Sequence, residues 1–145
     1  MDKRELLLKA IELDGKQPLH YSNLATTLPL GESLMLPSGE KVGERQLYLK
    51  AIELGSTKST DYSNLGALLG NTEVITLSTG VEVGKQQLYM KAIKLDSSNS
   101  AAFNNLGTVL VNGERVTLPS GEMMSRRQLH LKAIEVYAKN LKRNN

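Results

Sequence analysis

A fixed period of 41 residues constrains this chain more than any other feature of its sequence. The tripeptide Lys-Ala-Ile begins at Lys9, Lys50, Lys91 and Lys132, each copy 41 residues after the last. Other columns keep the same register: Leu6, Leu47, Leu88 and Leu129; Asn23, Asn64 and Asn105; Leu24, Leu65 and Leu106; Glu32, Glu73 and Glu114; Gly39, Gly80 and Gly121. Such a period is typical of repeat arrays, in which each repeat buries its apolar face by stacking on its neighbours. Arrays of this kind present surface and rarely perform chemistry.

Each repeat is predicted to begin with an amphipathic helix. In the middle repeat, residues 58–69 contain apolar residues at helical spacings of three and four: Tyr62, Leu65, Leu68 and Leu69. Gly70 and the asparagine after it form a helix stop signal. The first helix is therefore expected to end before residue 70.

A β-hairpin is predicted next, because the apolar period changes to two over residues 73–77. The turn after this segment reads Ser78-Thr79-Gly80, and its counterparts are Pro37-Ser38-Gly39 and Pro119-Ser120-Gly121. Proline first, a small polar residue second and glycine third suit a type I turn closed by a left-handed glycine.

The repeat ends with a second helix, predicted over residues 85–95. Its apolar stripe contains a central alanine, a small residue that lets a neighbouring helix approach closely. The stripe comprises Leu88, Tyr89, Ala92, Ile93 and Leu95; its counterparts are Leu47, Tyr48, Ala51, Ile52 and Leu54 before it and Leu129, His130, Ala133, Ile134 and Val136 after it.

The same columns set the predicted boundaries. Residues 1–14 match only the second helix and form a half-repeat, followed by repeats at 15–55, 56–96 and 97–145, the last with a C-terminal extension. We expect one mainly α-helical repeat domain over residues 1–145, with short β-hairpin insertions. Polar termini are expected to cap its end helices. Whether the chain is a fragment of a longer array stays open.

Composition excludes several classes of function. A net charge of +3, from 18 basic and 15 acidic side chains, is too small to argue for nucleic acid. The chain has no cysteine, which excludes disulfides and thiolate chemistry. A charged start followed by only three consecutive leucines fits neither a signal peptide nor a membrane span. We therefore expect a cytoplasmic protein with no membrane partner.

Apart from the hairpins, the whole chain resembles a known family. Two pairs of segments, residues 102–107 (AFNNLG) with 131–136 (LKAIEV) and residues 62–66 (YSNLG) with 91–96 (KAIKLD), resemble the two helices of the tetratricopeptide repeat. The period of 41 exceeds the family's period of about 34, and the hairpin accounts for the difference. Two further departures are Ala25, which stands where the other repeats have Gly66 and Gly107, and the missing proline after the second helix.

The resemblance implies a right-handed α-solenoid whose concave face, lined by the first helices, binds an extended peptide or a helix of a partner. Family members that clamp a C-terminal carboxylate carry lysine and arginine where this chain has Ser22, Ser63 and Asn104. Carboxylate clamping is therefore not expected, and these three residues stay candidates for uncharged peptide contacts.

The asparagine column is the main candidate site. Asparagine lowers helix propensity relative to alanine, and its amide can donate to and accept from a peptide backbone at once. Asn23, Asn64 and Asn105 would thus form a ladder for an extended ligand. In the alternative, each amide bonds a neighbouring helix or hairpin and keeps adjacent repeats in register.

No catalytic motif is present, so neither an enzyme nor a cofactor is expected. His20 and His130 are isolated, which disfavours a metal site. The column Glu32, Glu73 and Glu114 begins the hairpins one repeat apart, which indicates a structural role in place of a paired acid and base.

The leading hypothesis is a noncatalytic protein-interaction scaffold. One alternative is a structural protein that self-assembles as a homo-oligomer by stacking of its end helices. Another is an RNA-binding helical repeat, against which the acidic residues Glu53, Asp61 and Glu135 argue.

Overall fold

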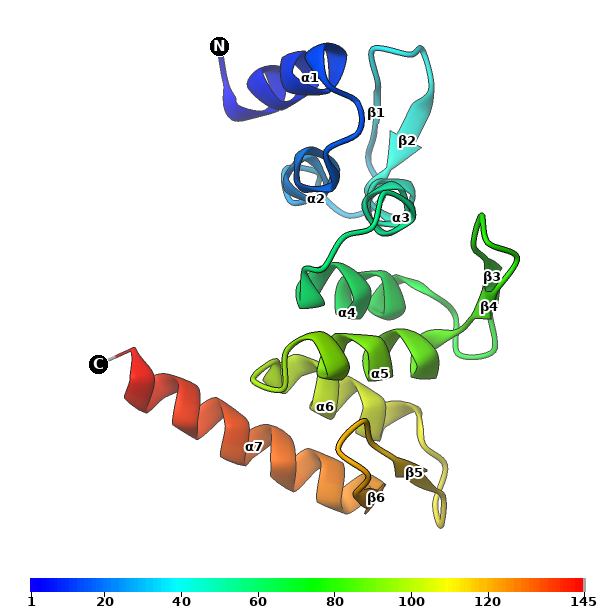
Figure 1. Ribbon diagram of the computed structural model, residues 1–145, viewed down its shortest axis with the longest axis vertical. Coiled ribbons are helices and arrows are strands. Elements are labelled where there is room, and N and C mark those ends of the chain that lie inside the picture. The colour runs from blue at the N-terminus through cyan, green and yellow to red at the C-terminus, as the bar shows by residue number, and fades with distance from the viewer. Residues whose placement is uncertain (145) are drawn as a thin grey trace. The chain divides into compact units, whose positions relative to one another are not determined.

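In the computed structural model, which describes residues 1–144, the chain forms two compact units, Met1–Thr57 (unit 1) and Lys58–Asn145 (unit 2). Each unit is mainly helical, with short antiparallel hairpins (Figure 1). The division falls close to the boundary predicted between the first and second repeats. The single repeat domain over the whole chain stays a prediction.

The elements follow the predicted order of helix, hairpin and helix (Figure 1). In unit 1, α2 packs on both α1 and α3; in unit 2, α5 packs on α4 and α6, and α6 packs on α7. Unit 1 comprises α1 (Lys3–Leu13), α2 (Pro18–Ala25), β1 (Ser33–Met35), β2 (Lys41–Gly43) and α3 (Glu44–Glu53). Unit 2 comprises α4 (Ser59–Leu68), β3 (Ile75–Thr76), β4 (Glu82–Val83), α5 (Lys85–Leu95), α6 (Ser100–Val109), β5 (Arg115–Thr117), β6 (Met123–Ser125) and α7 (Arg126–Arg143).

One column caps the second helix of every repeat. Three residues into α3, α5 and α7, the side-chain oxygens of Gln46, Gln87 and Gln128 accept hydrogen bonds of 3.0, 3.0 and 2.8 Å from the N–H of the residue before the helix. Glu5 does the same for α1 at 3.2 Å. Because the first N–H groups of a helix lack intrahelical partners, this contact fixes where each helix begins.

The predicted hairpin turns are confirmed. In all three hairpins the glycine N–H bonds the carbonyl oxygen three residues earlier at 2.8 Å, and the glycine φ is positive: 87° at Gly39, 85° at Gly80 and 91° at Gly121. The strands pair in register within each hairpin, for example Leu34 with Val42 in the first. Each hairpin is a separate two-stranded sheet.

The glutamate column has the structural role predicted for it in two of three repeats. The side chains of Glu73 and Glu114 each accept a hydrogen bond of 2.9 Å from the backbone N–H three residues earlier. In the first repeat that earlier residue is Pro29, which has no N–H. Glu32 therefore cannot form this bond.

The repeat column at positions 14, 55, 96 and 137 follows the apolar stripe of the second helix and determines whether the chain turns back there. Asp14 and Asp96 accept hydrogen bonds from the backbone N–H two residues on, at 3.0 and 2.9 Å, and Gly55 adopts a φ of 90°. Hydrogen bonds from the side chain and backbone of Ser98 hold the pKa of Asp96 below its ordinary value. Tyr137 stands at this column in the last repeat, and α7 continues through it for 18 residues in all.

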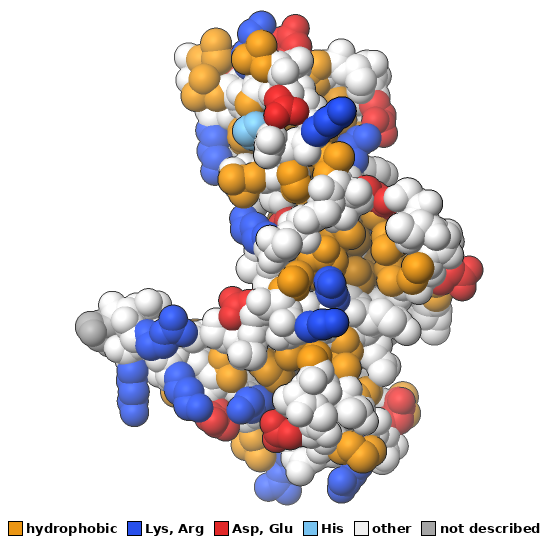
Figure 2. All heavy atoms as spheres, viewed as in Figure 1, with side chains coloured by type: hydrophobic (Ala, Val, Ile, Leu, Met, Phe, Trp, Pro, Cys, Tyr) orange, Lys and Arg blue, Asp and Glu red, His pale blue; other side chains and the backbone are white. Residues whose placement is uncertain are grey.

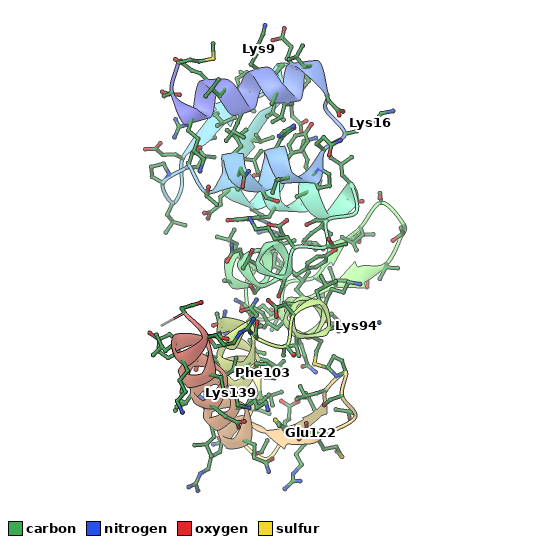
Figure 3. All side chains as sticks on the ribbon, turned by 60° about the vertical axis from the view of Figure 1, so that its left-hand side comes forward. Lys9, Lys16, Lys94, Phe103, Glu122 and Lys139 are labelled. Carbon is green, nitrogen blue, oxygen red and sulfur yellow. The ribbon has the colours of Figure 1, made fainter. Side chains whose placement is uncertain are left out.

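The core of each unit lies between the first and second helix of a repeat. The paired leucine columns Leu24 and Leu47, Leu65 and Leu88, and Leu106 and Leu129 are all buried, and Phe103 lies within the helix stack of unit 2 (Figure 3). Lys9 and Lys16 point outward from unit 1, as Lys94 does from unit 2 (Figure 3).

A close approach explains the glycine column of the first helices. A Cβ on Gly66 would lie 2.7 Å from Cε1 of Tyr89, and one on Gly107 would lie 3.0 Å from Cε1 of His130. Ala25 occupies this column in the first repeat, and α2 ends at Ala25. The departure from the family pattern thus coincides with a shorter helix.

The apolar stripe of the last second helix is partly exposed, at Ile134. Ile134 is 66% exposed, whereas its counterpart Ile93 on α5 is 5% exposed. The cause is the neighbouring helix: α6 packs on α5, while no helix follows α7 within residues 1–144. Leu6 is likewise exposed, although its column is buried in the other repeats.

We expect Gly80→Val to lower the free energy of unfolding by about 1 to 3 kcal/mol, because a β-branched residue is strained at positive φ. Apart from its two chain neighbours, no residue has an atom within 4 Å of an added Cβ, so the loss reports mainly backbone strain. Urea unfolding measures it, with Thr79→Val in the same turn as the control. Equal stability of the two variants would contradict the glycine turn.

Gly66→Ala is expected to destabilise the protein by up to about 2 kcal/mol, since overpacking against the Tyr89 ring outweighs the gain in helix propensity. In a Tyr89→Leu background the obstacle is gone, and the same change should stabilise by about 1 kcal/mol. A double-mutant cycle followed by urea unfolding tests this change of sign. If Gly66→Ala changes the free energy of unfolding in the same direction in both backgrounds, the Tyr89 ring is not the group that excludes a side chain at position 66.

Candidate peptide-binding face

The three asparagines of the predicted ladder lie on the first helix of each repeat. Asn23 on α2 and Asn105 on α6 are half-buried, and Asn64 on α4 is exposed. Among residues 1–144, the side-chain amides of Asn23 and Asn105 make no hydrogen bond to another residue. The structural alternative, in which every amide bonds a neighbouring helix or hairpin, therefore finds no support at these two positions.

Two of the companion candidates lie inside the protein. Ser22 is 1% exposed and its hydroxyl donates to the carbonyl oxygen of Pro18 at 3.3 Å. Ser63 is 4% exposed and its hydroxyl donates to the carbonyl oxygen of Thr60 at 3.4 Å. A ligand in solvent does not reach side chains this deeply buried, so a site at the surface is built from the other candidates.

The last candidate, Asn104, is exposed and bridges two helices. Its Oδ1 lies 2.9 Å from Nδ1 of His130, and the two atoms form a hydrogen bond between α6 and α7. His130 also faces Gly107, as described above. Asn104 thus has a partner within unit 2, unlike its neighbour Asn105.

A network around Asn99 was missed by the sequence analysis. The Oδ1 of Asn99 accepts from the N–H of Ala102 at 3.1 Å and so caps α6. Its Nδ2 donates to the hydroxyls of Ser59 at 2.9 Å and Ser63 at 3.3 Å. The Ser59 hydroxyl in turn donates to the carbonyl oxygen of Ala92 at 2.7 Å. One amide therefore links α4, α5 and α6.

The capping bond of this network could have been predicted from the sequence, since asparagine before a helix is a preferred N-cap. The bonds to Ser59 and Ser63 join residues 40 and 36 positions apart in the chain. No local pattern indicates them. The corresponding residues of the other repeats, Gln17 and Lys58, make no side-chain cap.

Three grooves lie elsewhere on the two units, and the asparagines line none of them. In unit 1 a groove of about 380 Å³ borders α3, where Lys50 forms an ion pair of 3.0 Å with Glu40 of the hairpin. In unit 2 a groove of about 580 Å³ separates Met90 and Lys94 of α5 from the turn of the third hairpin at Pro119. A third, of about 490 Å³, borders the start of α7.

Within residues 1–144, no three histidine, aspartate or glutamate side chains lie close enough together to hold a metal ion. Over the same residues, no helix has both the length and the apolar character needed to cross a bilayer. The sequence matches no protein-family model and no curated protein.

Asn99→Ala is expected to lower the free energy of unfolding by about 2 to 4 kcal/mol, the sum of a lost N-cap and two lost hydrogen bonds in a mostly buried site. Asn99→Asp keeps the capping oxygen and loses only the Nδ2 donors, so it should cost less than Asn99→Ala. Urea unfolding compares the two variants. If Asn99→Asp matched the wild type, the bonds to Ser59 and Ser63 would contribute nothing.

Proposed function

We propose that this protein is a noncatalytic interaction scaffold of tetratricopeptide-like repeats, which binds an extended peptide or a helix of a partner on the face carrying Asn23, Asn64 and Asn105. The most direct support comes from the hydrogen bonding of two side-chain amides, those of Asn23 and Asn105. Asn23 and Asn105 are half-buried on their helices, yet neither bonds another residue among those that the structure describes.

The chemistry of the amide fits the proposed ligand. A peptide backbone alternates N–H donors with carbonyl acceptors, and one asparagine can satisfy one of each. In a half-buried position the amide is partly shielded from water, so a hydrogen bond to a ligand competes with less solvent. A ladder at intervals of one repeat would recognise backbone more than side chains, and would tolerate varied peptide sequences.

The finer architecture belongs to the same proposal. Both units contain helix pairs joined by hairpins, which is compatible with a helical repeat. The right-handed solenoid and its concave groove are what the tetratricopeptide resemblance implies. In that arrangement the first helices of successive repeats line one groove, and the asparagines share it.

Self-assembly is the second candidate, and one observation favours it. Leu6 and Leu13 on α1 are 55% and 79% exposed, and Ile134 on α7 is exposed as well. Such apolar side chains on the end helices of an array favour stacking of one copy on another. Sedimentation at several protein concentrations distinguishes a self-associating array from a monomeric scaffold.

Changing Asn23, Asn64 and Asn105 together to alanine should leave stability within about 1 kcal/mol of the wild type, because alanine favours helix more than asparagine does and this offsets the loss of the contact that Asn64 makes. Binding of a peptide selected from a random displayed library should weaken by about one to three orders of magnitude, since each amide contact contributes about 0.5 to 1.5 kcal/mol and the losses are not fully additive. Calorimetric titration measures both affinities.

The matched control changes Asn71 and Asn112, exposed asparagines that follow the first helices, to alanine. This variant should bind as the wild type does. A triple variant that binds the peptide with unchanged affinity would remove the asparagine ladder from the binding site. A triple variant that melts several degrees lower would assign the amides to the fold.

A further inference from the structure

Helix α7 has two apolar faces, and only one of them is covered. Leu129, Ala133 and Val136 follow the spacing of one helix side and are buried, and Asn140 on the same side donates to the carbonyl oxygen of Ser98 at 2.8 Å. A second side carries Ile134, Tyr137 and Leu141, again at intervals of three and four. We call these three residues the outer stripe.

The outer stripe is exposed where its counterpart on α5 is covered. Ile134, Tyr137 and Leu141 are 66%, 58% and 49% exposed. On α5 the counterpart of Ile134 is Ile93, which is 5% exposed in unit 2, where α5 packs on α4 and α6. The position of Ile134 is thus buried on α5, a second helix on which the first helix of the following repeat, α6, packs.

Charge indicates which kind of helix suits α7. The helix carries six basic side chains and one acidic one, whereas the rest of the chain has 12 basic and 14 acidic residues. The single acidic residue, Glu135, is already paired with Lys132 at 3.7 Å and Lys139 at 3.0 Å. Figure 2 shows lysine and arginine side chains gathered along α7. An acidic partner therefore fits, and a second α7 would meet its own charge.

A groove extends the outer stripe at the start of α7. It has a volume of about 490 Å³ and lies between Asn112–Glu114 of the hairpin and Arg127, Leu131 and Ile134 of the helix. A wall on one side suits a rod-shaped ligand better than a flat membrane surface.

We propose that the outer stripe and this groove form a docking site for an acidic amphipathic helix of a partner protein. The partner helix lays leucine or aromatic side chains, spaced three and four apart, on Ile134, Tyr137 and Leu141. Its glutamates or aspartates face Arg127 and Lys142, which flank the stripe. This site does not depend on the asparagine ladder, which lies on the first helices.

The probe is a fluorescein-labelled synthetic peptide of about four helical turns, with leucines spaced three and four apart and glutamate and alanine elsewhere. Fluorescence anisotropy measures its binding to the full chain. Two control peptides keep the composition in scrambled order, or replace glutamate by lysine. We expect the acidic amphipathic peptide to bind at least about tenfold more tightly than either control.

Two variants test the position of the site. Ile134→Ser with Leu141→Ser should weaken binding about tenfold or more, and Arg127→Glu with Lys142→Glu should weaken it and abolish its decline with added salt. Matched controls are Leu13→Ser and Lys16→Glu on and after α1, where the side chains are also exposed. All these changes are at the surface, so circular dichroism should show unchanged helix content and melting.

Several outcomes would overturn the proposal. One is equal binding of the scrambled peptide, and another is an equal loss of binding in the α1 controls. A third is concentration-dependent self-association that Ile134→Ser with Leu141→Ser abolishes, which would identify a second copy as the occupant. The last is binding to vesicles containing about 30% phosphatidylserine in the absence of peptide binding, which would identify a membrane surface.

Discussion

The apolar seam between the two helices of each repeat is the contact on which the rest of both units depends. Its leucines, such as Leu65 and Leu88 in the middle repeat, are 0% and 2% exposed. Burial of each one contributes about 1.5 to 3 kcal/mol. Because the seam brings the helices this close, Gly66 must lack a side chain where the ring of Tyr89 crosses it. The glutamine caps and the hairpins only fix where the helices begin and how they are joined.

What happens at the end of the second helix decides how the array continues. The turns held by Asp14 and Asp96 bring the chain back within each unit, so that α2 packs on α1 and α6 packs on α5. Gly55, with its positive φ, stands at the same column after α3. Tyr137 at the same column offers neither a carboxylate to hold a tight turn nor the freedom of glycine. Helix α7 therefore runs on, and its outer stripe is left without the helix that its counterpart on α5 has.

Local features of the fold could be predicted from the sequence, and features set by neighbours could not. Gly80 shows the first kind, because a turn type and its positive φ depend on a few adjacent residues. Ile134 shows the second, since an apolar residue at helical spacing is buried only if another helix covers it. The Asn99 network joins side chains about a repeat apart, and hydrogen bonds between distant residues leave no period in the sequence.

The same distinction, between features set by local sequence and features set by neighbouring residues, applies to the candidate site. The repeat column places Asn23 and Asn105 at equivalent positions of two first helices, and their side-chain amides bond no other residue in the described part of the chain. The family resemblance also selected Ser63, but it could not show that this hydroxyl lies inside unit 2. Even the repeated lysines differ in their contacts: Lys50 pairs with a glutamate at 3.0 Å, whereas Lys91 lies 6.0 Å from the ring centre of Tyr62.

Because the three hairpins are separate sheets, the sequence of one hairpin can change without affecting the others. Each hairpin is its own two-stranded sheet, held to the helices by a capping glutamine at one end and, in unit 2, a glutamate at the other. A turn sequence can therefore be exchanged or lengthened without altering strand pairing in another repeat, since loop length has only a slow effect on stability. The surface of one repeat can therefore change through its hairpin turn, while the helix packing within that repeat and the hairpins of the other repeats are kept.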